Sequence, residues 1–272
     1  MPRISANKCE MHYEVDDYTD PWLKDKDTIW LQHGVGRSSK FWYHWVPALA
    51  RNYRVVRRDM RGHGLSADPG LNYTWSIDEL LNDMRGFLDA LGLDRVHYLG
   101  ESIGGILGIA FAAKWPERLK SLTVCSSPTA IRPSARTALT GSERELGSEL
   151  ERLGAGGWVK ILIQQKVISG KDPAHIEWVV SEWSKTPTHV LRGINRMLAS
   201  ADITPLLSQV KVPTLVLAPS RSPLTPLSDQ LTIRNSIPNA RMAVVEGPGH
   251  EIYVDEPEEC ISAFLKFLNT LA

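Results

Sequence analysis

The chain has 272 residues, 43% of them hydrophobic and 23% charged, so it is long enough to bury a sizeable core without disulfides or metal ions. Its 31 basic and 31 acidic residues cancel, which argues against a nucleic-acid or anionic-membrane partner and leaves a small molecule as the expected partner. Three widely spaced cysteines form neither a disulfide framework nor a zinc site. No secretory signal and no run of 18 apolar residues is visible. We therefore expect a cytoplasmic protein without a metal, with a homodimer left open.

Strand-like and helix-like runs alternate in the first half of the chain. This alternation indicates an α/β fold in which a mostly parallel sheet carries helices on both faces. Gly92 follows the helix expected at 77–91 and is suited to end it. The expected strands are 9–15, 28–33, 53–59, 96–100 and 119–126, and the expected helices are 41–50, 77–91 and 103–115.

The pattern changes after residue 127, where no convincing strand occurs until the strands expected at 212–218 and 241–245. A closing helix is expected at 256–271. We interpret 128–205 as a helical cap inserted after the sixth strand, and 1–127 with 206–272 as one core domain. A separate helical domain is less favoured, because the flanking strands need each other to complete one sheet. The helices expected in the insertion are 143–153, 158–168, 174–185 and 189–198.

The most informative motif is Gly100-Glu101-Ser102-Ile103-Gly104, placed between a predicted strand and a predicted helix. A G-x-S-x-G turn in that context holds its serine in a strained backbone conformation, clear of the sheet. The amino end of the following helix favours developing negative charge there. The sequence predicts that Ser102 is a nucleophile rather than a simple helix cap.

A second turn follows the strand that ends at His33-Gly34. Its use would be to present the backbone N–H of Val35 toward the serine, so that Val35 and Ile103 form an oxyanion hole. His33 itself is expected to be a structural hydrogen-bonding residue. We interpret 59–66, which contains Asp59 and His63, as a tight structural turn.

A serine nucleophile needs a base, and His250 lies on a glycine-flanked loop just past the last predicted strand. Of eight histidines, it alone combines a loop after a core strand with a position late enough for the order Ser…His. His250 is therefore the predicted base.

Together, these motifs resemble the α/β-hydrolase superfamily, serine-nucleophile branch. The resemblance covers nearly the whole chain outside the cap, and it is closest to esterases, enol-lactonases and carbon–carbon-bond hydrolases. The motifs that carry it are His33-Gly34, Asp59-x-Arg61-Gly62-His63-Gly64-x-Ser66, Gly100-x-Ser102-x-Gly104-Gly105 and Gly249-His250.

The chain departs from this family in the residue that orients the histidine. The resemblance implies an aspartate in the loop after the strand at 212–218, but Ser222 occupies that position. The alternative position, after the strand at 119–126, is not acidic either. Three explanations remain open: Ser222 bonds the imidazole as a neutral substitute, a carboxylate such as Asp229 reaches in, or the site is a dyad.

Tryptophans follow the oxyanion turn and recur in the cap. Trp42, Trp158 and Trp183 are candidates to line an aromatic substrate pocket between cap and sheet, although each alone is more typical of a packed core. Arg37, just past the oxyanion turn, is expected to be a solvated surface residue rather than a ligand for a substrate carboxylate. The glycines at 154–157 are expected to form a hinge between cap helices.

These residues predict a cofactor-free serine hydrolase that cleaves a small carboxylic ester or lactone through an acyl-enzyme. Two alternatives stay open. One is hydrolysis of a carbon–carbon bond beside a ketone, and the other is a non-catalytic ligand receptor on the same fold, which the missing acid motivates.

Overall fold

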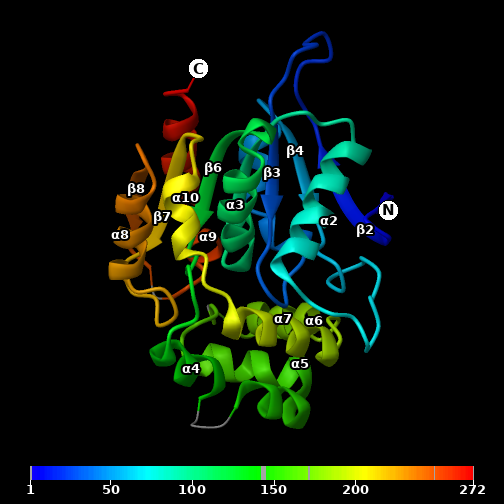
Figure 1. The fold of residues 1–272 in the computed structure, drawn as a ribbon, viewed down its shortest axis with the longest axis vertical. Helices are drawn as coiled ribbons and strands as arrows, with labels where there is room; N and C mark the ends of the chain where they lie inside the picture. The colour runs from blue at the N-terminus through cyan, green and yellow to red at the C-terminus, as the bar shows by residue number, and fades with distance from the viewer. Residues whose placement is uncertain (1, 142–144, 171, 248, 272) are drawn as a thin grey trace.

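A computed structural model describes residues 2–141, 145–170, 172–247 and 249–271, and its centre is one eight-stranded sheet (Figure 1). The strands are β1 (Arg3–Ala6), β2 (Cys9–Asp16), β3 (Thr28–Gln32), β4 (Arg54–Arg58), β5 (Val96–Glu101), β6 (Leu119–Cys125), β7 (Thr214–Pro219) and β8 (Arg241–Val245). Their order in the sheet is β1-β2-β4-β3-β5-β6-β7-β8. The β1–β2 and β2–β4 pairs are antiparallel, and all the other pairs are parallel. The α/β-hydrolase architecture is confirmed.

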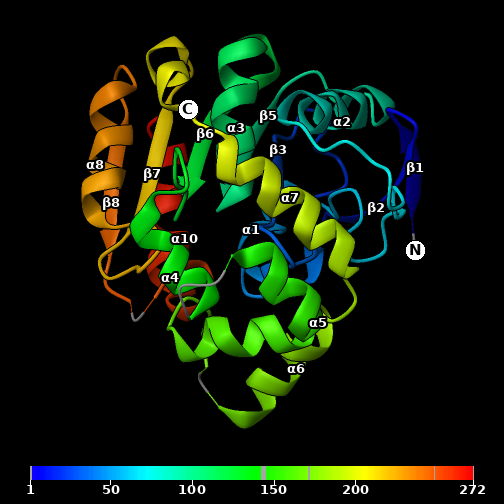
Figure 2. The same ribbon diagram turned by 60° about the horizontal axis from the view of Figure 1, so that its bottom comes forward.

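Helices cover both faces of this sheet (Figure 2). One face carries α2 (Ile77–Ala90), α3 (Ile103–Lys114) and α8 (Leu227–Ser236), and the other carries α1 (Trp45–Leu49) and α10 (Pro257–Leu268). Short helices connect them: η1 (Ser39–Trp42), η2 (Pro116–Arg118), η3 (Thr204–Gln209) and α9 (Ile252–Asp255). Because both faces are covered, every residue of β3, β5 and β7 is buried, which explains why apolar and polar residues do not alternate along these strands.

The helix α2 shows how local sequence sets an element's limits. The Ser76 side chain caps its amino end by accepting from the backbone N–H of Glu79 at 3.2 Å. Gly92, just past its end, adopts φ = +64°, as its expected role in ending the helix requires.

The segment between β6 and β7 folds into α4 (Pro133–Thr140), α5 (Leu146–Gln164), α6 (Pro173–Trp183) and α7 (Thr188–Ser200). These helices lie together beyond the carboxyl ends of the parallel strands, at the bottom of Figure 1. The insertion leaves and rejoins the core at one point, where Ala130 and Asp202 form an antiparallel bridge.

Several elements differ from the sequence-based expectations. The helix expected at 41–50 is split into η1 and α1, and the helices expected at 143–153 and 158–168 are one helix, α5, that is kinked at Gly154 (φ = +64°, ψ = 179°). The expected start at residue 143 lies outside the described residues. The sequence did not predict β1, α4 or α8.

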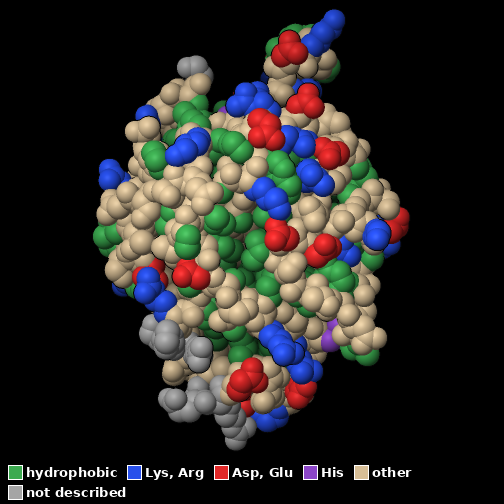
Figure 3. Space-filling view, in the orientation of Figure 1, with side chains coloured by type: hydrophobic (Ala, Val, Ile, Leu, Met, Phe, Trp, Pro, Cys, Tyr) green, Lys and Arg blue, Asp and Glu red, His purple; other side chains and the backbone are tan. Residues whose placement is uncertain are grey.

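Among the described residues, no helix is long and apolar enough to cross a membrane. The segment between β2 and β3 projects from the body at the top of Figures 1 and 3, and it carries the exposed side chains of Tyr18, Trp22 and Leu23. Figure 3 also shows hydrophobic side chains over α3, in the middle of the same face.

Candidate active site

The turn that joins β5 to α3 carries Ser102. Its backbone has φ = +54° and ψ = −118°, a sparsely populated conformation for a residue other than glycine. The flanking Glu101 and Ile103 are buried, whereas Ser102 is partly exposed. A side chain on Gly100 would lie 2.3 Å from the backbone of Gly104, so the tight reversal requires a glycine there. The turn therefore presents one hydroxyl at the edge of the sheet.

Backbone donors lie next to this hydroxyl. Ile103 is the first residue of α3, so its N–H has no partner within the helix. The turn after β3 lies alongside, because Gln32 pairs with Gly100 in the parallel register. Val35 is buried in that turn, and a Cβ built on Gly34 would lie 3.0 Å from the Cβ of Ser102. The two N–H groups predicted for the oxyanion hole thus come from neighbouring turns.

The histidine of the turn after β3 has a structural arrangement. His33 Nδ1 donates to the Gly34 carbonyl at 2.7 Å, and Nε2 accepts from the backbone N–H of Met60 at 2.9 Å. Burial holds its pKa well below the usual value, so it stays neutral. The carboxylate of Asp59 accepts from the backbone N–H groups of Ser39 and Leu65. Both residues fix turns, as the sequence analysis expects.

His250 lies in the loop after β8 and is 1% exposed. Its Nδ1 faces two hydroxyls, Ser222 Oγ at 3.2 Å and Thr225 Oγ1 at 3.3 Å. Thr225 Oγ1 donates its own proton to Ser222 Oγ at 3.0 Å, which leaves its lone pairs available to accept from Nδ1–H. This arrangement permits the tautomer whose free Nε2 is a base. Thr225 was not predicted from the sequence, since a threonine three residues past Ser222 carries no distinctive signal.

The other ring nitrogen of His250, Nε2, lies near a carboxylate. Within the described part of the chain, His250 Nε2 has no hydrogen-bond partner, and the Glu101 Oε1 atom lies 3.5 Å away. Burial, followed by the charge of Arg37, lowers the pKa of His250 to about 3. His250 is therefore neutral at rest. The hydrogen bond from Ser102 to Nε2 is not formed here; such contacts commonly tighten only when substrate binds.

Asp229, a candidate for the third triad member, does not lie at the imidazole. It occupies the first turn of α8, where its Oδ2 accepts from Arg132 Nε at 2.8 Å. The helix directs this carboxylate to the start of the insertion, whereas Ser222 lies in the loop before the helix and reaches Nδ1.

Arg37 is not the solvated surface residue that the sequence led us to expect. Its side chain is 3% exposed, and its Nε donates to Glu251 Oε1 at 2.5 Å. Its Nη1 lies 3.6 Å from Glu101 Oε2. The expectation failed because Glu251 is 214 positions away in the chain, so local sequence contains no trace of the pairing. The two carboxylates raise the pKa of Arg37 despite its burial, and the guanidinium stays charged.

The three tryptophans predicted for the pocket are all buried. Trp42 packs against Tyr253, with ring centroids 4.7 Å apart. Trp158 donates to the Leu139 carbonyl within the insertion and contacts the ring of Trp183 edge-on at 5.5 Å. Trp183 in turn lies 5.2 Å from the Arg37 guanidinium, so of the three it joins the insertion to the turn after β3.

Comparisons with known proteins agree with this geometry. Residues 27–153 match the family model described as alpha/beta hydrolase fold, and residues 196–271 match the model described as TAP-like protein. The putative carbamate hydrolase RutD of Caulobacter sp. (strain K31) is 30% identical over 254 residues, which cover 90% of this chain and 91% of that protein. The chain belongs to the α/β-hydrolase superfamily.

Two further comparisons match this α/β-hydrolase over nearly its full length. The 3-oxoadipate enol-lactonase 1 of Acinetobacter baylyi is 26% identical, and the match covers 89% of each chain. The solved enol-lactonase of Burkholderia xenovorans LB400 superposes with a TM-score of 0.82 at 22% identity, over 98% of this chain and all of the other. The fold is thus shared at full length, and hydrolase activity is supported.

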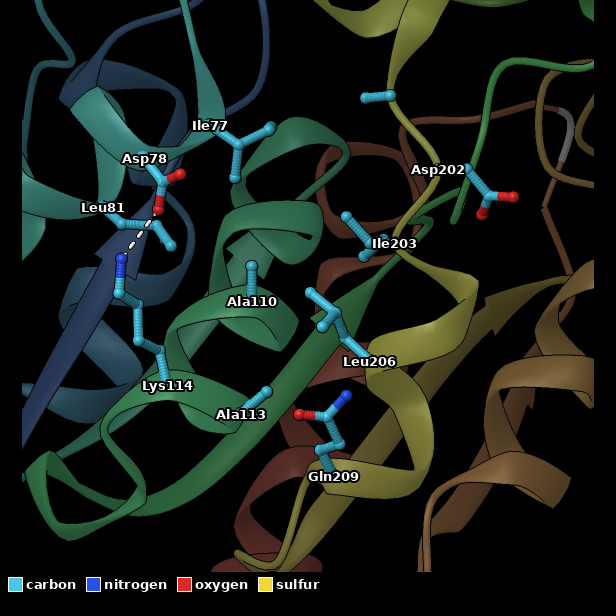
Figure 4. Close-up of a pocket in the computed structure, with 11 residues that line it drawn as sticks. Ile77, Asp78, Leu81, Ala110, Ala113, Lys114, Asp202, Ile203, Leu206 and Gln209 are labelled. Atoms are coloured by element: carbon cyan, nitrogen blue, oxygen red, sulfur yellow. Dashed lines mark hydrogen bonds and ion pairs between the residues drawn. The ribbon is translucent and has the colours of Figure 1, made fainter.

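Two cavities of this α/β-hydrolase lie away from Ser102 and His250. One, of about 430 Å³, lies between α2, α3 and η3, with the Asp78–Lys114 ion pair at 2.7 Å on its rim (Figure 4). The other, of about 520 Å³, is lined by Lys40, Tyr43, Arg57, His175 and Trp178. Across the described ranges, no group of three or more histidine, cysteine, aspartate or glutamate side chains is arranged to hold a metal ion. All three cysteines are unpaired and buried.

Proposed function

We propose that this α/β-hydrolase is a cofactor-free serine hydrolase that cleaves small carboxylic esters or lactones. The observation that carries the proposal is the strained turn at Ser102, which holds a partly exposed hydroxyl between Ile103, the first residue of α3, and the turn that contains Val35. A serine is rarely held at such backbone angles without a role that requires it.

The proposed reaction uses His250 as the proton carrier. The Ser102 Oγ–H proton moves to His250 Nε2 as Oγ bonds to the carbonyl carbon, and the carbonyl electron pair moves to an oxyanion that the Val35 and Ile103 N–H groups stabilise. The carbon–oxygen bond to the leaving group then breaks, and the proton on Nε2 passes to the departing oxygen. Water repeats the sequence on the acyl-enzyme and releases the acid.

The uncharged groups at His250 Nδ1 favour substrates that have a good leaving group. Removing the acid from a working triad costs about 10⁴-fold in turnover, yet such variants remain roughly 10³-fold faster than water. Ser222 and Thr225 are uncharged, so a poor leaving group such as an amine would be disfavoured. Lactones and enol or aryl esters are favoured, which agrees with the enol-lactonase among the relatives. We infer that the α4–α7 insertion, through Trp183, caps the substrate.

A non-catalytic ligand receptor is the second candidate. It is favoured because, among the described residues, hydroxyls and no carboxylate face His250 Nδ1, and a receptor has no need to stabilise an imidazolium.

Labelling with a fluorophosphonate probe separates the two candidates, because the probe reacts only with an activated serine. We expect labelling of the native protein and hydrolysis of an aryl acetate, with both lost in Ser102→Ala. Ser228→Ala, an exposed serine on α8, is the matched control and should label normally. An unlabelled native protein would favour the receptor.

A further inference from the structure

A buried carboxylate lies beside His250 Nε2, the ring nitrogen that faces the serine in the family pattern. Glu101 is fully buried at the end of β5, and its Oε1 lies 3.5 Å from His250 Nε2. Its Oε2 lies 3.6 Å from Arg37 Nη1. The side chain that precedes the proposed nucleophile therefore contacts the same nitrogen that would receive the proton.

Space for this carboxylate exists because residue 34 is glycine. A Cβ on Gly34 would lie 2.2 Å from Glu101 Oε2 and 3.0 Å from Arg37 Nη1. Any larger residue would displace the carboxylate from its position between Arg37 and His250.

The charges around the imidazole do not balance while His250 is neutral. Arg37 contributes one positive charge, and Glu101 and Glu251 contribute two negative charges when ionised, which leaves one in excess. Glu251 is held in place from two sides, by Arg37 Nε and by the backbone N–H of Ser169 at 2.9 Å. An imidazolium at His250 would bring this buried cluster to neutrality, and charges in a low-dielectric interior interact strongly.

A carboxylate at Nδ1 normally does two things: it fixes the tautomer and it stabilises the imidazolium. The hydroxyls of Ser222 and Thr225 permit the first but carry no charge for the second. We propose that Glu101 replaces the missing triad acid by stabilising the His250 imidazolium from the Nε2 side. This inference rests on the proposed hydrolase function.

The ionisation of Glu101 gives the proposal a pH signature. Burial raises the pKa of Glu101 to about 7, against the lowering effect of Arg37. Other titratable groups near Glu101 and His250 are Glu251, Tyr253 and Cys125; burial raises the pKa of the tyrosine and the cysteine, so both stay neutral near pH 7. Since only ionised Glu101 stabilises the imidazolium, kcat/KM should rise with pH through about 7.

The experiment measures kcat/KM for an aryl acetate from pH 5 to 9, together with the rate of fluorophosphonate labelling. Glu101→Gln keeps the side-chain shape and removes the charge, so it should lower kcat/KM by about 100-fold and abolish the acid limb. Asp83→Asn neutralises another buried carboxylate, which pairs with Arg61 away from the site, and is the matched control. It should reduce stability and keep the acid limb in place.

The Ser222→Asp substitution tests the same idea from the other side of the ring. The double variant Glu101→Gln, Ser222→Asp should have a kcat/KM at least tenfold higher than that of Glu101→Gln alone, because the new carboxylate faces Nδ1. If Glu101→Gln does not fold, Ser222→Asp alone still decides the question. The acid limb of the kcat/KM profile of this variant should move to lower pH, since stabilisation of the imidazolium would no longer depend on ionised Glu101.

The outcomes are distinguishable from failure of the proposed function. Native protein that hydrolyses the ester while Glu101→Gln stays within threefold of it, with an unchanged acid limb, overturns this inference alone. If the acid limb of the kcat/KM profile is unchanged in Ser222→Asp, the inference about Glu101 is also overturned. Native protein that neither labels nor hydrolyses overturns both the hydrolase and the role of Glu101.

Discussion

Two regions at the carboxyl edge of the sheet behave differently: the turn after β5, which carries Ser102, and the loop after β7, which carries Ser222. The first keeps the family pattern, and its backbone adopts the strained angles that the motif predicts. The second carries Ser222 where the family pattern has an acidic residue, and two hydroxyls face the imidazole. A strained turn depends on close packing over several residues, whereas one negative charge can be supplied from another direction. The position of the strained turn is therefore more constrained than the position of the negative charge.

The largest expected effect concerns the turn after β5. Ser102→Ala and Ser102→Gly should each lower aryl-ester hydrolysis by at least about 1000-fold, because both remove the nucleophile. They should differ in stability. Glycine adopts φ = +54° without a Cβ penalty, so Ser102→Gly should be more stable than Ser102→Ala by about 1 kcal/mol. Thermal unfolding and steady-state rates measure both effects; equal stabilities would show that the turn is not strained.

The buried histidines near these two regions should make the stability of the protein sensitive to acid. Burial lowers the pKa of His63 to about 4 and of His250 to about 3, and it holds that of His33 well below its usual value. The unfolded chain therefore binds more protons below pH 6.5, and stability should fall as pH decreases from 6.5 toward 4. The loss at pH 5 is on the order of 1–2 kcal/mol per histidine. The raised pKa of Glu101 acts in the opposite direction between about pH 4.5 and 7, and three histidines outweigh it.

Urea unfolding at pH 7.5, 6 and 5 measures this dependence. His63→Asn, beside the turn after β3, and His250→Asn, in the loop after β8, should each make the fall in stability with decreasing pH shallower. A pH dependence that neither substitution changes would contradict the assignment of neutral buried imidazoles to His63 and His250.

The smallest expected effect separates the two residues proposed for the third triad position. Ser222→Ala should slow aryl-ester hydrolysis by roughly tenfold, about 1.4 kcal/mol, since Thr225 remains at Nδ1. Asp229→Asn should leave the rate within about twofold and lower stability, because it weakens only the contact with Arg132. Steady-state rates decide, and the reverse order would place Asp229 at the imidazole during turnover.

Much of this fold follows from local sequence. The limits of α2 and β8 were predicted almost to the residue, because caps and apolar periods are encoded locally. The position of Ser102 follows from the motif in the same way. Other features depend on residues distant in the chain. Arg37 is buried by Glu251, and Glu101 meets His250 only once β5 and the loop after β8 come together. Pairings of this kind leave no local pattern, so the sequence did not reveal them.

The bridge between Ala130 and Asp202 has a consequence for how such enzymes diversify. The Ile203 N–H donates to the Thr129 carbonyl at 3.0 Å, and the hydroxyls of Thr129 and Thr204 lie 2.9 Å apart, so the two ends of the insertion are fastened side by side. Everything between them forms a closed detour that can lengthen, shorten or be exchanged without moving a strand. Changes in the sequence and length of the insertion can therefore accumulate independently of the sheet beneath it.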